Sequence, residues 1–473
     1  MKSLFQRLGF PQKESSPKAS SLDSPGGLDA PLTTRMIFKQ WFPLALSWTV
    51  MSFDGIILAA IMARLPDPKI NLAAYGGIAF SLAFVMSAPI SSMLAISTAL
   101  SRNWQAFARL RKFMLMVALA ITAVYALIAL TPLYYWVAGT VIGAPAEILE
   151  PGRWGLIILM PFPFLVGFRR LQQGVLIRFG QADGVTISTF LRIITEVILL
   201  LLGMRFLRIP GIMIATGAQT GGMVVEMLYA TLRARPVIRN ELKAAPVDQE
   251  LTWRDLLRFF IPFSLSTIIS FSFQFINSAG MSRMPMPIES LAIFPVVSSF
   301  AWMLQGPGVA HQEVVVSLLD RRKSTGILRR FTISLITGEL LLTLLVLLTP
   351  LSILWFTGVS SLSPDLARMA NLAMWFFLPQ SGIAVLQCWY QGLIIYSRRT
   401  RLMTEAIVVS LAVEIVIMAA GILTGRFSGI YVASFAFLFA YAAQIFWQYL
   451  RSRSYARSLH ERDQQEAAVL TSQ

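Results

Sequence analysis

The sequence has very few of the residues that bind structural metals or form disulfides. It contains one cysteine, Cys388, and two histidines, His311 and His460, among 473 residues. A single cysteine cannot form an internal disulfide, and a structural zinc site needs about four nitrogen or sulfur ligands. We therefore expect no disulfide, no metal and no other cofactor.

Charge is also scarce. Only 14% of the residues are charged and 56% are hydrophobic, whereas soluble domains carry about 25% charged residues. The apolar residues form runs of about 20, the length that crosses roughly 30 Å of hydrocarbon as a helix. The sequence predicts an all-α, multi-pass membrane protein whose main partner is the lipid bilayer.

Catalytic motifs are missing as well. The chain has no GxxxxGK[ST] phosphate loop, no dinucleotide fingerprint and no nucleophile motif, so we expect no enzyme activity. Lys and Arg number 40 against 24 for Asp and Glu, but most of the excess lies in short connections between apolar runs. There it sets membrane orientation, so we expect no nucleic-acid partner.

Twelve apolar segments predict twelve membrane helices in two six-helix lobes. The first six are expected at 40–63, 72–100, 113–137, 154–177, 184–207 and 211–232. The second six are expected at 257–282, 289–318, 328–350, 367–396, 402–423 and 429–450.

Basic residues cluster in the connections after the second, sixth, eighth and tenth predicted spans, and the opposite connections hold only isolated ones. By the positive-inside rule both termini are cytoplasmic. The domains predicted are a disordered tail (1–34), an N-terminal lobe (35–233), a cytoplasmic linker (234–256), a C-terminal lobe (257–450) and a second tail (451–473).

The two halves of the chain repeat each other. Pro43, Ser47, Arg64, Pro66 and Pro68 recur 219 residues later as Pro262, Ser266, Arg283, Pro285 and Pro287. Gln173, Gly174, Glu196, Arg208 and Gly211 recur 218 residues later as Gln391, Gly392, Glu414, Arg426 and Gly429. Parallel repeats of a membrane unit are typical of transporters with a substrate path between the lobes.

Charged residues in the middle of a span usually face a cavity or a partner, because burying them in lipid costs at least about 2.5–3.5 kcal/mol. We predict that six of them line the substrate or ion pathway: Asp54, Arg169, Arg170, Arg192, Glu196 and Glu414. Asp54 has no cation within one helical turn, which favours a role in ion coupling or gating. Glu226 is interpreted as a helix-packing residue.

The arginines indicate the sign of the substrate. Arg169, Arg170 and Arg192 lie in neighbouring spans, and guanidinium groups bind carboxylates and phosphates. The pattern favours a small anionic substrate. Two structural alternatives remain open: Arg192 and Glu196 could form a pair that holds one helix in register, and Arg169 and Arg170 could extend to the lipid headgroups.

The first two spans resemble the opening of the MATE/MOP exporter superfamily. The similarity lies in Pro43–Leu44, Arg64–Leu65, the run LAAYGGIAFSL and Ala88-Pro89-Ile90. The run LAAYGGIAFSLAFVMSAPIS and the later LMPFPFLVGFRRLQQGVLIRFG are most similar to the progressive ankylosis branch.

The resemblance implies two lobes that rock between inward- and outward-open states, driven by a proton or sodium gradient. In the multidrug branch an acidic residue of the first span, which couples transport to the ion gradient, lies where this chain has Leu58. Asp54 lies one turn earlier on the same helix face, so the resemblance transfers the coupling role to Asp54 by its helix face and not by its position in the motif. The ankylosis branch implies export of small anions such as citrate, pyrophosphate or nucleotides.

Together these features predict a monomeric secondary transporter that exports a small anionic organic or phosphorylated solute across the plasma membrane, the inner membrane of a bacterium. A multidrug antiporter and a lipid-linked oligosaccharide flippase are the alternatives. A non-transporting scaffold or receptor is disfavoured by the mid-membrane charges and by the short tails.

Overall fold

The computed structural model describes residues 32–245, 251–319, 324–397 and 401–471, and these residues form helices without a strand. The predicted tail 1–34 lies outside the described residues except for its last three. The middle of the linker (246–250) and the basic segments 321–323 and 398–399 also lie outside them.

The helices follow one another along the chain with short connections. The first half contains α2 Thr34–Met62, α3 Pro68–Ala74, η1 Tyr75–Ala79, α4 Phe80–Ser91, α5 Met93–Leu100, α6 Trp104–Leu130, α7 Leu133–Tyr135, η2 Trp136–Ile142, α8 Ala146–Ile158, α9 Phe162–Arg178, α10 Asp183–Phe206, α11 Gly211–Val237 and η3 Ile238–Leu242. The second half contains α12 Trp253–Met281, α13 Pro287–Leu318, α14 Ser324–Leu348, α15 Leu351–Leu354, η4 Trp355–Val359, α16 Pro364–Tyr396, α17 Arg401–Thr424 and α18 Gly429–Thr471.

Eleven helical segments within the described residues are long and apolar enough to cross a membrane, which confirms a polytopic helical fold. The predicted sixth span, 211–232, forms α11 but is not among the eleven. Its helix carries Thr216, Gln219 and Glu226, all buried, which lower its hydropathy. Because α11 packs against α8, α9 and α10, it crosses the same layer as its neighbours.

Large apolar side chains cover the outside of the bundle. Exposed residues of this kind include Leu119, Leu127, Ile194, Ile198, Leu341, Leu345 and Val416. On a soluble protein such a surface would cause aggregation, whereas lipid chains solvate it. These side chains are therefore the lipid-facing surface of α6, α10, α14 and α17.

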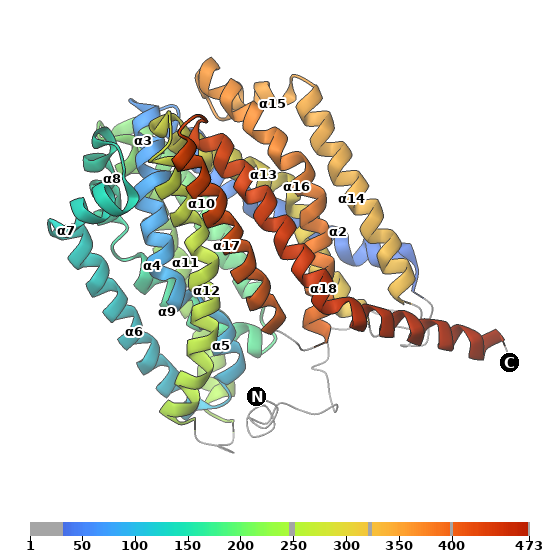
Figure 1. Ribbon diagram of the computed structural model, residues 1–473. Helices are drawn as coiled ribbons and strands as arrows, with labels where there is room; N and C mark the ends of the chain where they lie inside the picture. Colours follow the sequence, from blue (N-terminus) through green and yellow to red (C-terminus); the bar gives the residue numbers. More distant parts are fainter. Residues whose placement is uncertain (1–31, 246–250, 320–323, 398–400, 472–473) are drawn as a thin grey trace.

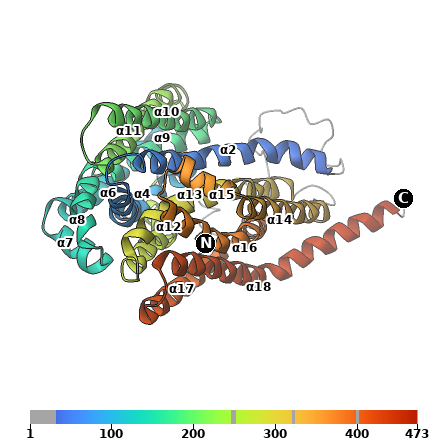
Figure 2. The same ribbon diagram turned by 90° about the horizontal axis from the view of Figure 1, so that it is seen from above.

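The helices form two lobes (Figure 1). One contains α3 to α11 and the other α13 to α18. The first helix of each half lies at the boundary: α2 packs along α13 of the other half, and α12 packs along α4. In the view from above, α2 runs between the α9–α11 group and the helices of the C-terminal lobe (Figure 2).

The internal repeat is visible in local geometry. Asp67 and Met286, 219 residues apart, both have a left-handed backbone (φ of 51° and 56°) immediately before the proline that begins the next helix. The side-chain oxygen of Asn71 accepts from Ile212 N at 3.0 Å, and that of Ser290 accepts from Ile430 N at 3.1 Å. Equivalent residues thus make equivalent bonds in both lobes.

Two repeat-equivalent arginines, at the ends of α2 and α12, join the two halves to each other. Arg64, after α2, donates to the carbonyls of Gly358 and Val359 at 2.9 Å. Arg283, after α12, donates to three carbonyls of 140–142 at 2.6–2.8 Å. Each guanidinium satisfies carbonyls at the end of a π-helical turn in the opposite half, where backbone carbonyls have no helical partner. Lys69 and Glu289 add an ion pair between α3 and α13.

Candidate functional site

The N-terminal lobe contains a buried cluster of charges where α9, α10 and α11 meet α2. Its centre is Arg192 on α10, whose Nη1 donates to both carboxylate oxygens of Asp54 at 2.9 and 3.0 Å. The same Nη1 donates to Glu196, one turn along α10, at 3.3 Å. Arg192 therefore joins the first span to the fifth.

Glu226 on α11 is the second centre of the cluster, and it is fully buried. Its carboxylate accepts from Arg169, accepts from Gln173 Nε2 at 3.0 Å, and lies 3.2 Å from Nε of Arg192. A buried carboxylate with two guanidinium partners and an amide donor is well compensated for the loss of water. Glu226 is therefore the structural anchor that holds both arginines.

Helical spacing explains how these side chains meet. Arg169 and Gln173 are four residues apart on α9 and therefore share a face, as do Arg192 and Glu196 on α10. Gly222 of α11 permits the close approach of α10, because a Cβ there would lie 3.0 Å from the carbonyl oxygen of Arg192. The small residue at this contact lets Glu226, one turn further along α11, reach the arginines.

The accessibility of the cluster is uneven. The Asp54 side chain is 26% exposed, while those of Arg192, Glu196 and Glu226 are 12%, 3% and 0% exposed. Asp54 is thus the most exposed of these four side chains. The cluster can exchange a proton or bind a cation at Asp54, and an anion can replace Asp54 on Arg192.

The six predicted pathway residues do not all lie together. Asp54, Arg169, Arg192 and Glu196 belong to the cluster, and Arg170 is close enough to interact electrostatically with Arg169 and Glu226. Asp54, which has no cation within one turn of its own helix, pairs with Arg192 of α10 in the fold. Arg169 and Arg192 are bound to carboxylates, so these two arginines do not form an uncompensated basic wall.

Glu414 lies apart, on α17 of the C-terminal lobe. It is fully buried beside Asn277, and neither of its oxygens has a hydrogen-bond partner among the described residues. The position equivalent to Arg192 is Ser410, which cannot neutralise a carboxylate. The repeat therefore keeps the acid in both lobes and the arginine in one.

Sequence reasoning assigned Glu226 to helix packing but did not predict its ion pairs with Arg169 and Arg192. The signal that could have identified it is a lone acid in the sixth span beside two spans that carry arginines, since a mid-membrane acid needs a nearby cation.

No protein-family model and no curated protein matches the chain, but solved structures do. An inward-facing multidrug resistance MATE family transporter of the MOP superfamily is 16% identical, with a TM-score of 0.58 over 91% of this chain and 96% of that chain. The chain has the MATE/MOP fold. The predicted fold class is thereby confirmed.

Two other structures with the MATE/MOP fold extend the comparison. The lipid II flippase MurJ, in an inward closed conformation, is 14% identical with a TM-score of 0.62 over 87% of each chain. A MOP superfamily transporter from Pyrococcus furiosus, described as having a binding pocket of reverse polarity, is 16% identical with a TM-score of 0.57 over 91% of this chain and all of that chain.

Proposed function

We propose that the chain is a secondary transporter that exports a small anionic organic or phosphorylated solute by alternating access. The observation that carries this proposal is the Arg192–Asp54 pair, because it places an anion-binding group under the control of an acid on α2. Relatives in fold that are named as transporters support it, and enzyme activity is not part of the proposal.

Helix α2 can transmit a change at Asp54 because it contacts both lobes. Asp54 binds α10, while the next residue, Gly55, lies against Ser299 of α13 so closely that a Cβ would come within 2.6 Å of its hydroxyl. Nearer the start of α2, Trp41 donates to the carbonyl of Pro307 on α13 at 2.8 Å. A shift of α2 therefore moves the two lobes relative to each other.

In the proposed mechanism Asp54 is an internal counter-ion that a substrate anion displaces. Binding of a proton or a sodium ion to Asp54 removes its attraction for Arg192, whose guanidinium then binds the anion, so the ion and the anion are carried together and their export follows the outward gradient of the anion. Glu196 and Tyr75 are close enough to Asp54 to interact with it electrostatically, and Glu196 and Glu226 also pair with Arg192. With Asp54 ionised, three carboxylates surround Arg192 and repel an anion; with Asp54 neutral, two remain.

Asp54→Asn tests this mechanism. The variant permanently removes one of the three carboxylates that pair with Arg192, so we expect about ten-fold tighter anion binding at neutral pH. We also expect it to lose the tightening of anion binding that acidification should cause in the wild type. Scintillation proximity binding of radiolabelled citrate, pyrophosphate and nucleotides to purified protein, measured from pH 5 to 8, checks both effects. Unchanged affinity and an unchanged pH profile would remove Asp54 from the proposal.

The control is Asp183→Asn. Asp183 is an exposed acid at the start of α10 that pairs with the half-exposed Arg233 at 3.5 Å. The control makes the same change of charge on α10, the helix that carries Arg192, without touching the cluster, and it should leave binding unchanged. Uptake into proteoliposomes under imposed proton or sodium gradients then identifies the coupling ion.

The outer arginines offer a test of alternating access. Replacing Arg64 and Arg283 by alanine removes the bonds that hold the outer ends together, so we expect a shift toward an outward-open state. Spin labels at the exposed Val141 and Val359, in a Cys388→Ser background, report it as a longer and broader distance distribution. The double variant Arg208→Ala with Arg426→Ala, a repeat-equivalent exposed pair, is the control. Identical distributions in all proteins would contradict the gating role.

Two alternatives are separated by the same assays. A multidrug antiporter would transport cationic drugs and ignore the anions, and a flippase would translocate a lipid-linked diphosphate and ignore soluble substrates. The fold similarity to a lipid II flippase favours including fluorescent lipid-linked sugars in the panel. Robust drug efflux without anion flux would overturn the proposal.

We further propose a monomer in the plasma membrane, with both termini cytoplasmic and sequence closest to the progressive ankylosis branch. The orientation is supported by the basic residues around the start of α6, including Arg109, Arg111 and Lys112. Terminal reporter fusions active only in the cytoplasm test it.

A further inference from the structure

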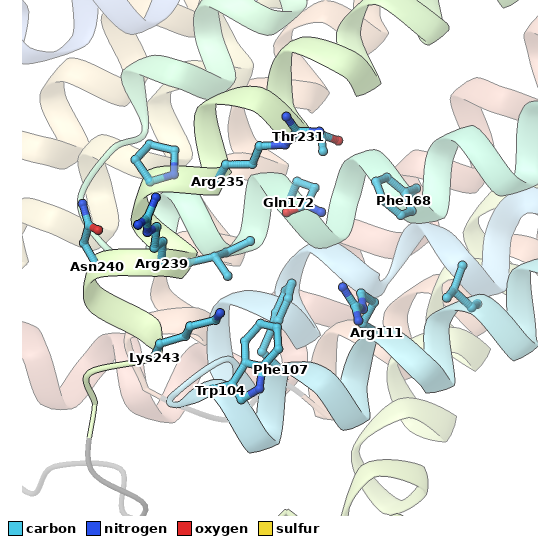
Figure 3. Close-up of a pocket in the computed structure, with 13 residues that line it drawn as sticks. Trp104, Phe107, Arg111, Phe168, Gln172, Thr231, Arg235, Arg239, Asn240 and Lys243 are labelled. Carbon is cyan, nitrogen blue, oxygen red and sulfur yellow. The ribbon is translucent and has the colours of Figure 1, made fainter.

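A second polar site lies at one end of the N-terminal lobe, outside the charge cluster. It is a cavity of about 920 Å³ where α6 begins and α11 runs into η3, with α9 as its third wall (Figure 3). Four cationic side chains line it: Arg111, Arg235, Arg239 and Lys243. No acidic residue is among the lining residues, so the cavity has a strongly positive potential.

Among the residues that the structure describes, these four cations have no carboxylate partner. Arg111 and Lys243 lie over the ring of Trp104, at 5.9 and 4.9 Å from its centre. An aromatic ring positions a cation but leaves its N–H donors unused, and these donors remain for an anion.

A buried amide provides an independent sign that a ligand belongs in the cavity. Gln172 on α9 lines the cavity and is only 4% exposed. Its side-chain oxygen is buried and has no hydrogen-bond partner among the described residues. Buried polar atoms in proteins nearly always have a partner. A ligand hydroxyl group would satisfy this acceptor next to the cations.

The rest of the lining is apolar and aromatic, with Trp104, Phe107 and Phe168 forming the wall along α6 and α9. The cavity lies at the start of α6 and the end of α11, and the ends of membrane-spanning helices are where lipid headgroups are expected. We propose that it binds the phosphate headgroup of an anionic phospholipid, with the four cations on the phosphate, Gln172 on a headgroup hydroxyl and the aromatic wall against the glycerol and upper acyl chain. Arginine forks match phosphate geometry, and anionic lipids are bound by such basic pockets.

The cavity is a site separate from the charge cluster, though the two share α9. Phe168 and Gln172 face the cavity, whereas Arg169 and Gln173 face Glu226 on the adjacent side of the same helix. The proposal therefore stands without the proposed transport activity, and lipid binding can be measured directly.

The test is native mass spectrometry of purified protein titrated with phosphatidylglycerol or with phosphatidylcholine. The wild type should bind one phosphatidylglycerol much more tightly than phosphatidylcholine. The variant Arg235→Gln with Arg239→Gln should bind phosphatidylglycerol about twenty-five-fold more weakly, since each basic residue near a membrane surface contributes about a five-fold factor. The control, Arg254→Gln with Arg258→Gln, removes two exposed cations outside the cavity and should bind as the wild type does.

Two further arms complete the experiment. Glycerol 3-phosphate and inorganic phosphate, added as competitors, should not displace the lipid at millimolar concentration; displacement would show that the ligand is a soluble phosphate and would overturn the lipid assignment. Gln172→Leu should weaken the binding of phosphatidylglycerol and leave the binding of phosphatidylcholine unchanged. If the double variant is not folded, Lys243→Gln replaces it. Equal affinity for both lipids, or an equal loss in the control, would refute the site.

Discussion

Replacing Arg192 by alanine is expected to lower the free energy of unfolding by about 3–5 kcal/mol and to abolish transport. The guanidinium has carboxylate partners on three helices: Asp54, Glu196 and Glu226. Its removal leaves Glu196 without an ion-pair partner in the described structure and Glu226 with only Arg169. The protein loses its connection between α2 and α10 at the same time as its anion-binding group.

The measurement is thermal unfolding in lipid nanodiscs, paired with proteoliposome uptake. Arg205→Ala is the control, because Arg205 is an exposed arginine near the end of the same helix. Adding Asp54→Asn to Arg192→Ala should restore part of the stability but none of the transport, since one unpaired charge is removed and the binding group is still missing. Wild-type stability of the single variant would show that the charges of the cluster do not stabilise one another.

Replacing Glu226 by alanine should be similarly destabilising, by about 3–5 kcal/mol, for the opposite electrostatic reason. Two buried arginines, Arg169 and Arg192, would then face each other without the carboxylate between them. Gln173 would lose its acceptor too. Glu226→Gln keeps the shape and an acceptor oxygen, so it should cost less than the alanine variant.

Unfolding in nanodiscs also checks this prediction. The matched control is Glu405→Ala, because Glu405 pairs with Arg401 and Arg451, whose side chains are 85% and 51% exposed. Exposed ion pairs contribute about 0–1 kcal/mol, so this variant should be close to the wild type. Equal losses for Glu226 and Glu405 would mean that burial does not distinguish them and that Glu226 is no anchor.

The course of the chain through the membrane could be predicted from the sequence, because lipid demands long apolar helices. Residues 184–207, for example, form α10 at Asp183–Phe206. The span 211–232 shows the limit of apolarity as a signal. Its helix is buried among α8, α9 and α10, so it tolerates polar residues that a lipid-facing span does not.

The charge cluster could be predicted only in part. The Arg192–Glu196 pair follows from helical spacing, but Asp54 is 138 residues from Arg192, and spacing within one helix says nothing about such a pair. The sequence also left Arg169 free to reach the headgroups, whereas the fold directs it to Glu226. Pairings between helices depend on which faces the packing brings together, and Glu226 shows that a residue assigned to packing can decide that arrangement.

Arg64 and Arg283, which each bind backbone carbonyls of the opposite half, have a consequence for biosynthesis. Arg283 must be synthesised before the turn at 140–142 receives its donors, and Arg64 waits for residues 358–359, almost 300 positions later. The carbonyls of residues 140–142 therefore have no arginine donor until the second half of the chain has been synthesised. Each half supplies an arginine that donates hydrogen bonds to backbone carbonyls of the other half. The two subunits of a symmetric dimer exchange contacts in the same reciprocal way.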